Sequence, residues 1–246
     1  MRFFIRISYR GTDFHGWQEQ PNVHTIQAEI NKALSTVLHS SVQIIGAGRT
    51  DAGVHAKQMF AHFDSDINFV IKDLLFRVNN FLSNDIVIHD IFEVDVEANS
   101  RFDAISRTYQ YNIISRKNPF NKTAYLFKKE LDVVAMNDAC QYILGKQDFT
   151  SFSKVNTQTF TNNCNVINAM WETKDNQLFF IITADRFLRN MVRSIVGTML
   201  DVGVGKILPD TMPAIISAKD RCVAGTSVPA HGLFLMDITY PDNIRK

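Results

Sequence analysis

The segment from residue 46 to 55 holds the residue types and spacing best suited to chemistry. It reads GAGRTDAGVH, so Arg49 and Asp51 lie in a stretch with three glycines in eight residues, which permits close approach of a ligand. Two phosphate-binding patterns fail here, because Asp51 stands where GxGxxG needs glycine and no Gly-Lys-Ser/Thr follows. Asp51 is then either a nucleophile or base, which Arg49 would keep ionised, or a turn aspartate that bonds its own backbone.

The histidines near this segment indicate structural roles rather than a metal site. His55 and His62 are seven residues apart with no cysteine beside them, a poor spacing for a closed metal site. His231 lies in a later loop, 224–233, and no nucleophile motif accompanies it. We therefore expect no metal, and a hydrolase that uses Asp51 with His55 or His231 stays as an alternative.

Three arginines form a second candidate site. Apolar spacing predicts a helix over residues 188–202, with Arg189 and Arg193 opposite its apolar side and Gly197 continuing their line. If the helix begins one turn earlier, Arg186 joins them. The stripe contains no acid, and arginine suits phosphate geometry, so it favours polyanion contact, with Gly197 admitting a partner. A solvated helix face is the alternative.

Two tyrosines share one face of a predicted strand over residues 107–115. Tyr109 and Tyr111 alternate with polar residues. Buried tyrosines with bonded hydroxyls are one reading, and a tyrosine stacked on a nucleic-acid base is the other.

Periodicity predicts an α+β fold, an antiparallel-rich sheet with helices packed on it. Thr25 is a candidate cap of the first helix, and Asp175-Asn176 predicts a hairpin. Asp210 is a candidate cap of a late short helix. Helices are expected at about 26–38, 71–82, 133–144, 188–202 and 211–218, and strands at about 3–9, 42–45, 58–63, 86–94, 107–115, 165–172, 177–184 and 233–240.

Bulk charge conceals a difference between two halves joined near residues 98–106. The chain of 246 residues has net charge +1, but residues 1–104 hold 9 Lys+Arg and 13 Asp+Glu, whereas residues 105–246 hold 17 and 12. The nets of −4 and +5 make a polyanion partner possible for the second half. Three scattered cysteines, no signal-peptide pattern and no apolar run near ~20 residues predict a cytoplasmic protein without a membrane span.

Several motifs together resemble the TruA family of tRNA pseudouridine synthases, nearly from end to end. They are YRGTDFHGWQ at 9–18, GRTDAGVHA at 48–56, RTYQY at 107–111, FLRNMVRSIVG at 187–197 and PAHGLFL at 229–235. The segment around Asp51 is highly specific to that family.

The resemblance implies a pseudouridine synthase fold of two α/β halves, 1–104 and 105–246, that share a mixed, mostly antiparallel sheet with the active-site cleft between them. It implies isomerisation of uridines 38, 39 and 40 in the tRNA anticodon stem-loop by a cytoplasmic homodimer. An isomerisation needs no redox cofactor and no energy source, so no cofactor is expected.

The resemblance also implies a role for each matching residue. Asp51 corresponds to the essential aspartate, for which attack at uracil C6, attack at ribose C1′ and a glycal route all stay open. Arg49 corresponds to the residue that enters the RNA stack when the base flips. Tyr109 corresponds to the tyrosine that stacks on the flipped base, Arg193 to an arginine that pairs with the aspartate, and Leu233 to an apolar wall of the uracil pocket. Arg186 and Arg189 are expected to hold phosphates.

Some positions depart from the family pattern. Ala98 and Asn99 replace a usual Phe and His, and Gln147 replaces a usual His. These differences affect expectations about local RNA contacts and substrate range. A noncatalytic RNA-binding module with an RRM-like sheet is the main rival, although the aromatic-rich RNP1 pattern is missing.

Overall fold

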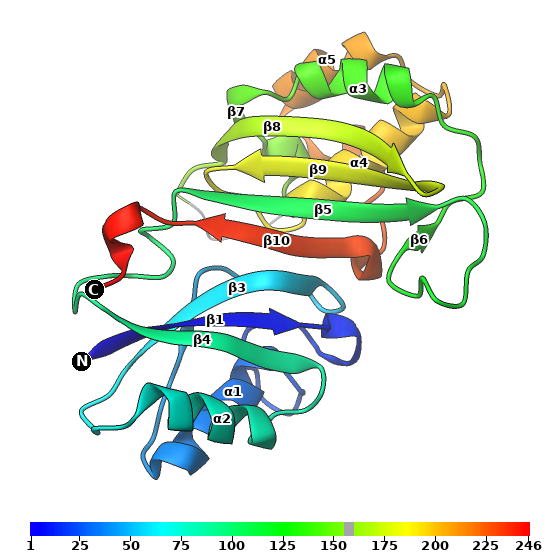
Figure 1. Cartoon of the computed structure of the whole chain (residues 1–246). Helices are drawn as coiled ribbons and strands as arrows, with labels where there is room; N and C mark the ends of the chain where they lie inside the picture. Colours follow the sequence, from blue (N-terminus) through cyan, green and yellow to red (C-terminus); the bar gives the residue numbers. More distant parts are fainter. Residues whose placement is uncertain (155–159) are drawn as a thin grey trace. The chain divides into compact units, whose positions relative to one another are not determined.

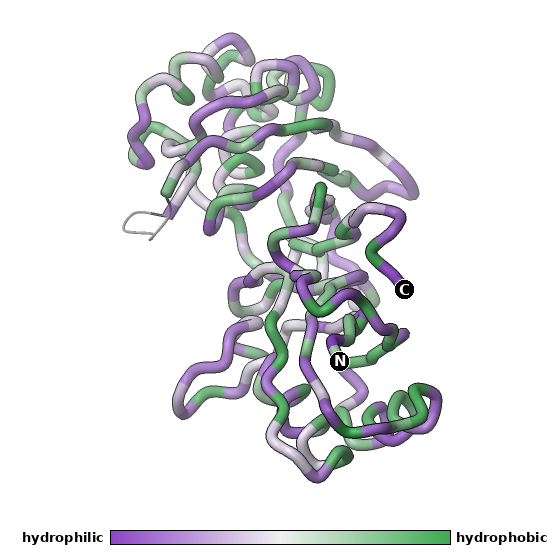
Figure 2. Tube along the Cα trace, turned by 90° about the vertical axis from the view of Figure 1, so that its left-hand side faces the viewer, coloured by the Kyte–Doolittle hydropathy of each residue, from purple (hydrophilic) through white to green (hydrophobic). Residues whose placement is uncertain are grey.

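The computed structural model describes residues 1–154 and 160–246. The chain forms two compact units, one of Met1–Ile105 with Phe234–Lys246 and one of Ser106–Leu233. The predicted boundary near 104 therefore falls beside the first crossing between units. The segment from Phe234 onward packs with the first unit, although the prediction had grouped it with the second half. Hydrophobic and hydrophilic stretches alternate along both units (Figure 2).

The first unit contains a mixed sheet with the strand order β4-β1-β3-β10, and β2 pairs with β3. The β1–β3 and β1–β4 pairs are antiparallel, whereas β10 runs parallel to β3. Helices α1 and α2 pack together, and α2 packs against β4 (Figure 1). Its elements are β1 (Arg2–Tyr9), α1 (Ile26–Leu38), β2 (Ile45–Gly46), β3 (His55–Asp64), α2 (Ile71–Phe81), β4 (Ile86–Val94) and β10 (Leu233–Thr239).

The second unit contains the strand order β5-β9-β8-β7, with β6 added parallel to β5. The β5–β9, β9–β8 and β8–β7 pairs are antiparallel, and α3 packs on β8 and on α4 (Figure 1). Its elements are β5 (Ser106–Ile114), β6 (Tyr125–Leu126), α3 (Val133–Gln141), β7 (Gly145–Asp148), β8 (Asn163–Lys174), β9 (Gln177–Ala184), α4 (Met191–Gly203) and α5 (Met212–Ala218).

The α+β prediction is confirmed, because both units combine mixed, mostly antiparallel strands with packed helices. Local signals account for several elements. The Thr25 side chain accepts a hydrogen bond from the Ala28 amide and caps α1, a contact typically worth about 1 kcal/mol. Asp175 and Asn176 both have positive φ, 50° and 59°, as a two-residue hairpin turn requires.

Two local expectations were wrong. Asp210 does not cap α5, because it lies in a 3-10 turn and Thr211 precedes the helix. Helix α4 begins at Met191, three residues after the predicted start, because Asn190 is left-handed with φ 68° and cannot continue a helix. No helix in the described ranges is long and apolar enough to cross a membrane.

Candidate functional site

The Asp51 segment is a loop between β2 and β3 that its own unit holds firmly. The Thr50 carbonyl accepts the Trp17 amide at 3.1 Å, and the Thr50 hydroxyl bonds the Tyr9 hydroxyl at 2.8 Å. Trp17 is 1% exposed, so the contact is a core contact. The Asp51 carbonyl accepts the Val54 amide at 3.1 Å and closes a turn. Residues 9–17 therefore fix the backbone of this loop.

Gly11 explains how residues 9–17 can support the loop so closely. Its amide donates to His55 Nδ1 at 3.1 Å, and a Cβ built on Gly11 would lie 2.0 Å from the Val54 carbonyl oxygen. No side chain fits at that distance. The motif at residues 9–18 and the motif at residues 48–56 therefore pack together, and the first serves as the scaffold of the second.

Arg49 and Asp51 occupy different environments within this loop. The Arg49 side chain is exposed and makes no ion pair or hydrogen bond with any residue in the described ranges, whereas Asp51 is partly buried and has a partner. The structure therefore shows no ion pair between Arg49 and Asp51. Arg49 is an exposed arginine, without a partner among the described residues, and is available to a ligand.

The histidines have the structural roles that their spacing predicted. His55 is 1% exposed, accepts the Gly11 amide, and stacks on Phe234 with ring centroids 4.5 Å apart. His62 is 2% exposed and bonds Ser100 Oγ at 2.8 Å. Burial lowers the pKa of His62. Across the described residues no group of three or more His, Cys, Asp or Glu side chains is arranged to hold a metal ion.

The two tyrosines of β5 lie in different environments. Tyr111 is 0% exposed and its hydroxyl donates to the Pro229 carbonyl at 2.7 Å, and burial raises its pKa. Tyr109 lies on the same face but is only partly buried, with its ring edge-on to Phe187 at 5.1 Å between centroids. The buried face of β5 therefore opens at Tyr109, where an aromatic surface is accessible.

Arg193 lies in the first turn of α4 and is oriented by the loop of residues 224–228. Its Nε donates to the Val228 carbonyl at 2.7 Å, and its own carbonyl accepts the Val228 amide at 3.2 Å. These two bonds fix the direction of a partly buried guanidinium. A guanidinium held in this way is pre-organised to meet an anion.

Gly197 does not admit an external partner, which corrects the sequence interpretation. It is buried, and a Cβ built on it would lie 1.8 Å from the Thr226 carbonyl oxygen. The neighbouring Thr198 hydroxyl accepts the Gly225 amide at 2.8 Å. The position that resembled a docking glycine therefore seats the chain's own loop, the one that orients Arg193.

We expect Gly197→Ala to destabilise the protein by about 3 kcal/mol, because the backbone carbonyl at Thr226 cannot move aside easily. For a chain of this size the melting temperature should fall by about 6–12 °C, measured by thermal unfolding. Gly48→Ala is the matched control, since a Cβ at Gly48 meets nothing within 4 Å. Equal melting temperatures for the two variants would contradict the packing argument.

Arg186 and Arg189 do not share a helix face with Arg193. Both precede α4, since the left-handed Asn190 separates them from it. The Arg186 amide donates to Asp185 Oδ1 at 2.7 Å, whereas the Arg189 side chain is exposed and its carbonyl accepts the Lys154 amide. The three arginines therefore do not form a stripe on one helix. Arg186 and Arg189 lie in the turn before α4, and Arg193 lies in its first turn.

Leu233 is 6% exposed and begins β10. Before it, a Cβ on Gly232 would lie 2.7 Å from the Tyr111 ring. Gly232, which belongs to the second unit, therefore packs closely against Tyr111 of β5 in the same unit.

Sequence reasoning missed the polar residues that hold the loop of residues 224–228. Asn190 Nδ2 donates to Ser227 Oγ at 2.6 Å and to Ser194 Oγ at 3.0 Å. Arg221 also donates to Ser227 Oγ, at 2.9 Å. Ser227 has no motif of its own. The one signal in the sequence was Asn190, a residue type that adopts positive φ more readily than most.

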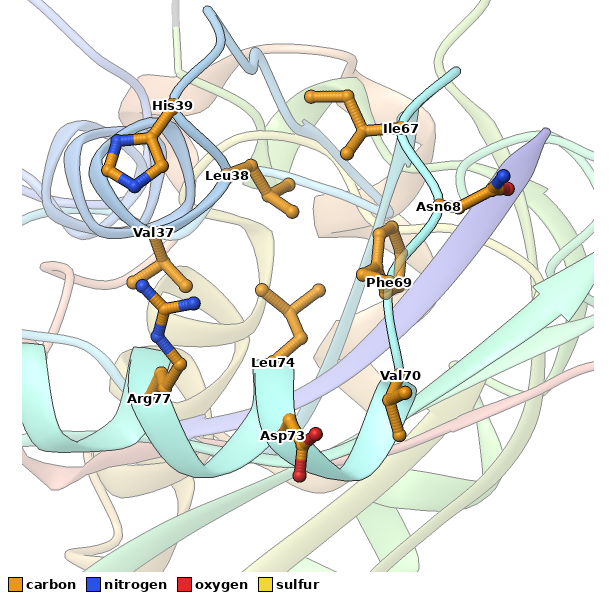
Figure 3. Close-up of a pocket in the computed structure, with 10 residues that line it drawn as sticks. All are labelled: Val37, Leu38, His39, Ile67, Asn68, Phe69, Val70, Asp73, Leu74 and Arg77. Atoms are coloured by element: carbon orange, nitrogen blue, oxygen red, sulfur yellow. The ribbon is translucent and has the colours of Figure 1, made fainter.

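A separate cavity of about 300 Å³ lies between the end of α1 and the start of α2 (Figure 3). Apolar side chains such as Leu38, Phe69 and Leu74 line it, with Asp73 and Arg77 also on its wall. None of the predicted site residues lines this cavity, so it does not belong to the candidate site.

Comparisons with known proteins identify the family of this chain. Residues 139–241 match the family model described as tRNA pseudouridine synthase. Proteins named tRNA pseudouridine synthase A are similar over nearly the whole chain: that of Parabacteroides distasonis is 50% identical, covering 99% of this chain and 97% of its own. That of Bacteroides thetaiotaomicron is 46% identical, covering 99% and 92%. That of Azobacteroides pseudotrichonymphae is 48% identical, covering 100% and 99%.

The chain belongs to the tRNA pseudouridine synthase A family. It is accordingly an isomerase that acts on uridines of tRNA. Among solved structures, a chain of a Cbf5–Nop10–Gar1 complex aligns with 80% of this chain and 54% of its own at a TM-score of 0.33 and 10% identity, too weak a similarity to support a conclusion.

Proposed function

We propose that this enzyme converts uridines 38, 39 and 40 of the tRNA anticodon stem-loop to pseudouridine, with Asp51 as the nucleophile. The observation that carries the proposal is the contrast within one loop. Its backbone is fixed by Trp17 and Gly11, its carboxylate is partly buried, and the neighbouring Arg49 is exposed without a protein partner. A loop with a fixed backbone and a partly buried carboxylate suits nucleophilic catalysis, which requires a reacting atom held in place.

The reaction breaks the bond between uracil N1 and ribose C1′ and forms a bond between uracil C5 and ribose C1′. The hydrogen on C5 leaves as a proton and N1 gains one, so the overall change is an isomerisation. The target base must leave the RNA stack before Asp51 can reach it. In the proposal the exposed Arg49 occupies the space that the flipped base vacates.

Residues of the second unit complete the proposed assignment. In the proposal, Tyr109 offers its aromatic face to the flipped uracil, and its hydroxyl takes part in proton removal. Leu233 supplies an apolar wall. Arg193, oriented by the Val228 carbonyl, pairs with the ionised Asp51. The proposal therefore assigns residues of both units to one reaction, and it includes a homodimer that acts on one tRNA in the cytoplasm.

Mapping pseudouridine in tRNA before and after incubation with the purified protein tests the proposal directly. We expect new pseudouridine at positions 38, 39 and 40 and at no other uridine. Conversion elsewhere would contradict the position, and binding without any conversion would favour a noncatalytic RNA-binding module. Turnover of a nucleotide or ester without RNA would favour a hydrolase.

We expect Arg189→Ala to weaken tRNA binding with little effect on the rate of the bound complex, because the exposed Arg189 side chain is assigned to a phosphate. Each lost phosphate contact lowers the slope of log K against log salt by about 0.7–0.9. Titrations between 50 and 200 mM salt measure that slope. Lys206→Ala is the control, since Lys206 is an exposed cation of the same unit to which no phosphate is assigned, and it pairs with Asp201 at 3.1 Å. A slope identical to wild type in Arg189→Ala would remove Arg189 from the interface.

A further inference from the structure

Residues 115–129 of the second unit form an exposed basic segment that the proposed mechanism does not use. The segment follows β5 and includes β6 (Figure 1). It contains five exposed cations and no acid, and within the described parts of the chain none of the five makes an ion pair or hydrogen bond. The five are Arg116, Lys117, Lys122, Lys128 and Lys129.

The basic segment accounts for the net positive charge of the second unit. The second unit, residues 106–233, holds 15 Lys+Arg and 10 Asp+Glu, a net of +5. The segment alone contributes five cations and no acid, so outside it the charges of this unit balance. Solvated protein surfaces normally mix both signs. Concentration of the whole excess on one segment indicates a polyanionic partner.

The tip of the basic segment is shaped to project an aromatic ring. Asn118 Oδ1 accepts the Phe120 amide at 2.9 Å, and the Asn118 carbonyl accepts the Asn121 amide at 3.2 Å. Ala124 is buried, and its amide donates to the Asn121 carbonyl. These successive turns leave the Phe120 side chain 93% exposed. The exposed Phe120 ring thus offers an apolar face, and Lys117 and Lys122 flank it in the sequence.

The basic segment is also anchored to the strand that carries Tyr109. The Phe127 amide donates to the Ile114 carbonyl at 2.9 Å, and Tyr125 pairs with Ile113 across the parallel β5–β6 contact. The segment starts six residue steps along the chain after Tyr109, which is about 20 Å at the usual rise per strand residue. The five cations therefore stand at a fixed, remote distance from the proposed uracil position.

We propose that the basic segment is a second tRNA contact, remote from the reacting uridine, in which the five cations bind backbone phosphates and Phe120 stacks on an unpaired base. This inference rests on the proposed function, because it assumes the same tRNA substrate. Unpaired lysines and arginines bind phosphate through charge, and an exposed aromatic ring accepts any base face. The contact raises the affinity for the whole tRNA and leaves the chemical step to Asp51.

Removing three charges tests the phosphate contacts. The triple variant is Lys117→Gln, Lys122→Gln, Lys128→Gln. Raising the salt from 50 to 200 mM multiplies the tRNA dissociation constant by some factor, and this factor should be about 20- to 40-fold smaller for the variant than for wild type. The value of kcat at saturating tRNA should be unchanged while KM rises. The matched control is Lys146→Gln, Lys174→Gln, Lys206→Gln, three exposed lysines of the same unit outside the segment.

The outcomes separate this inference from the proposed function. A wild-type salt dependence in the segment variant overturns the inference even if uridine conversion is normal, and so does an equal loss in the control variant. Failure of wild-type protein to convert uridine in any tRNA overturns the proposed function instead. All six substitutions are on exposed side chains, and thermal unfolding checks that both triple variants fold.

Phe120→Ala tests the stacking contact. We expect tRNA affinity to fall by about 5- to 150-fold, the range that loss of one stacked base gives, with the salt slope retained. Sedimentation of the same variant without RNA reports self-association. If Phe120→Ala changes the oligomeric state and leaves tRNA affinity as in wild type, Phe120 serves a protein interface and the stacking contact is wrong.

Discussion

An Asp51→Asn variant is expected to bind tRNA almost as wild type does and to form pseudouridine at least about 10³-fold more slowly, because the amide cannot act as the nucleophile. The loop should keep its shape, since Thr50, Asp51 and Val54 hold it through backbone atoms and the Thr50 hydroxyl. Nucleoside analysis of digested tRNA measures product, and a filter-binding titration measures affinity.

Asp66→Asn is the control for that experiment. Asp66 lies in the same unit with a fully exposed side chain, and its ion pair with the N-terminal amine is long, at 3.8 Å. Its rate should match wild type. A normal rate in Asp51→Asn would remove Asp51 from the chemistry, and a loss of both rate and affinity would assign it to binding.

Arg193→Ala is expected to lower kcat by about 10²- to 10³-fold, the loss typical of removing one pre-organised charge-stabilising donor. Arg193→Lys should recover little of the rate, because lysine lacks the planar fork whose Nε bonds the Val228 carbonyl. Single-turnover kinetics with saturating tRNA measure the effect separately from binding.

The control for Arg193→Ala is a variant that loosens the loop of residues 224–228 and leaves the Arg193 guanidinium unchanged. Thr198→Val removes the hydroxyl that accepts the Gly225 amide at 2.8 Å, and it leaves both Arg193–Val228 bonds in place. We expect it to cost stability and to keep most of kcat. If Thr198→Val slows the reaction as much as Arg193→Ala, then Arg193 acts only by holding the loop.

Elements with strong local signals could be predicted from the sequence, and elements defined by distant contacts could not. The strand at 86–94 and the hairpin at Asp175-Asn176 depend on alternation and turn chemistry within a few residues. The start of α4 was misplaced because Leu188 continues the apolar spacing, although it is buried in the turn before the helix. The left-handed Asn190 outweighs that periodicity.

The site shows the same division. The motif identified Asp51, but the partners of its loop come from residues 9–17, and no spacing rule links them. Gly197 correctly predicted that another group packs closely against this helix, but the predicted partner was wrong. The loop of residues 224–228, about thirty residues later in the chain, packs there instead of an external ligand. The net charge of each half indicated a polyanionic partner. Which cations are exposed and unpaired, namely those of residues 115–129, could be identified only from the burial and pairing that the structure shows.

The position of β10 in the first unit has a consequence for biosynthesis. Phe234 and Leu235 pair with His55 and Ala56, at the start of β3 directly after the Asp51 loop. β3 ends at Asp64 and β10 ends at Thr239, so at ~5–20 residues per second a ribosome needs roughly 10–35 s to make the chain between them. During that interval this edge of β3 lacks its partner strand. The parallel partner of β3, the strand that follows the Asp51 loop directly, is therefore added only after the whole second unit has been translated.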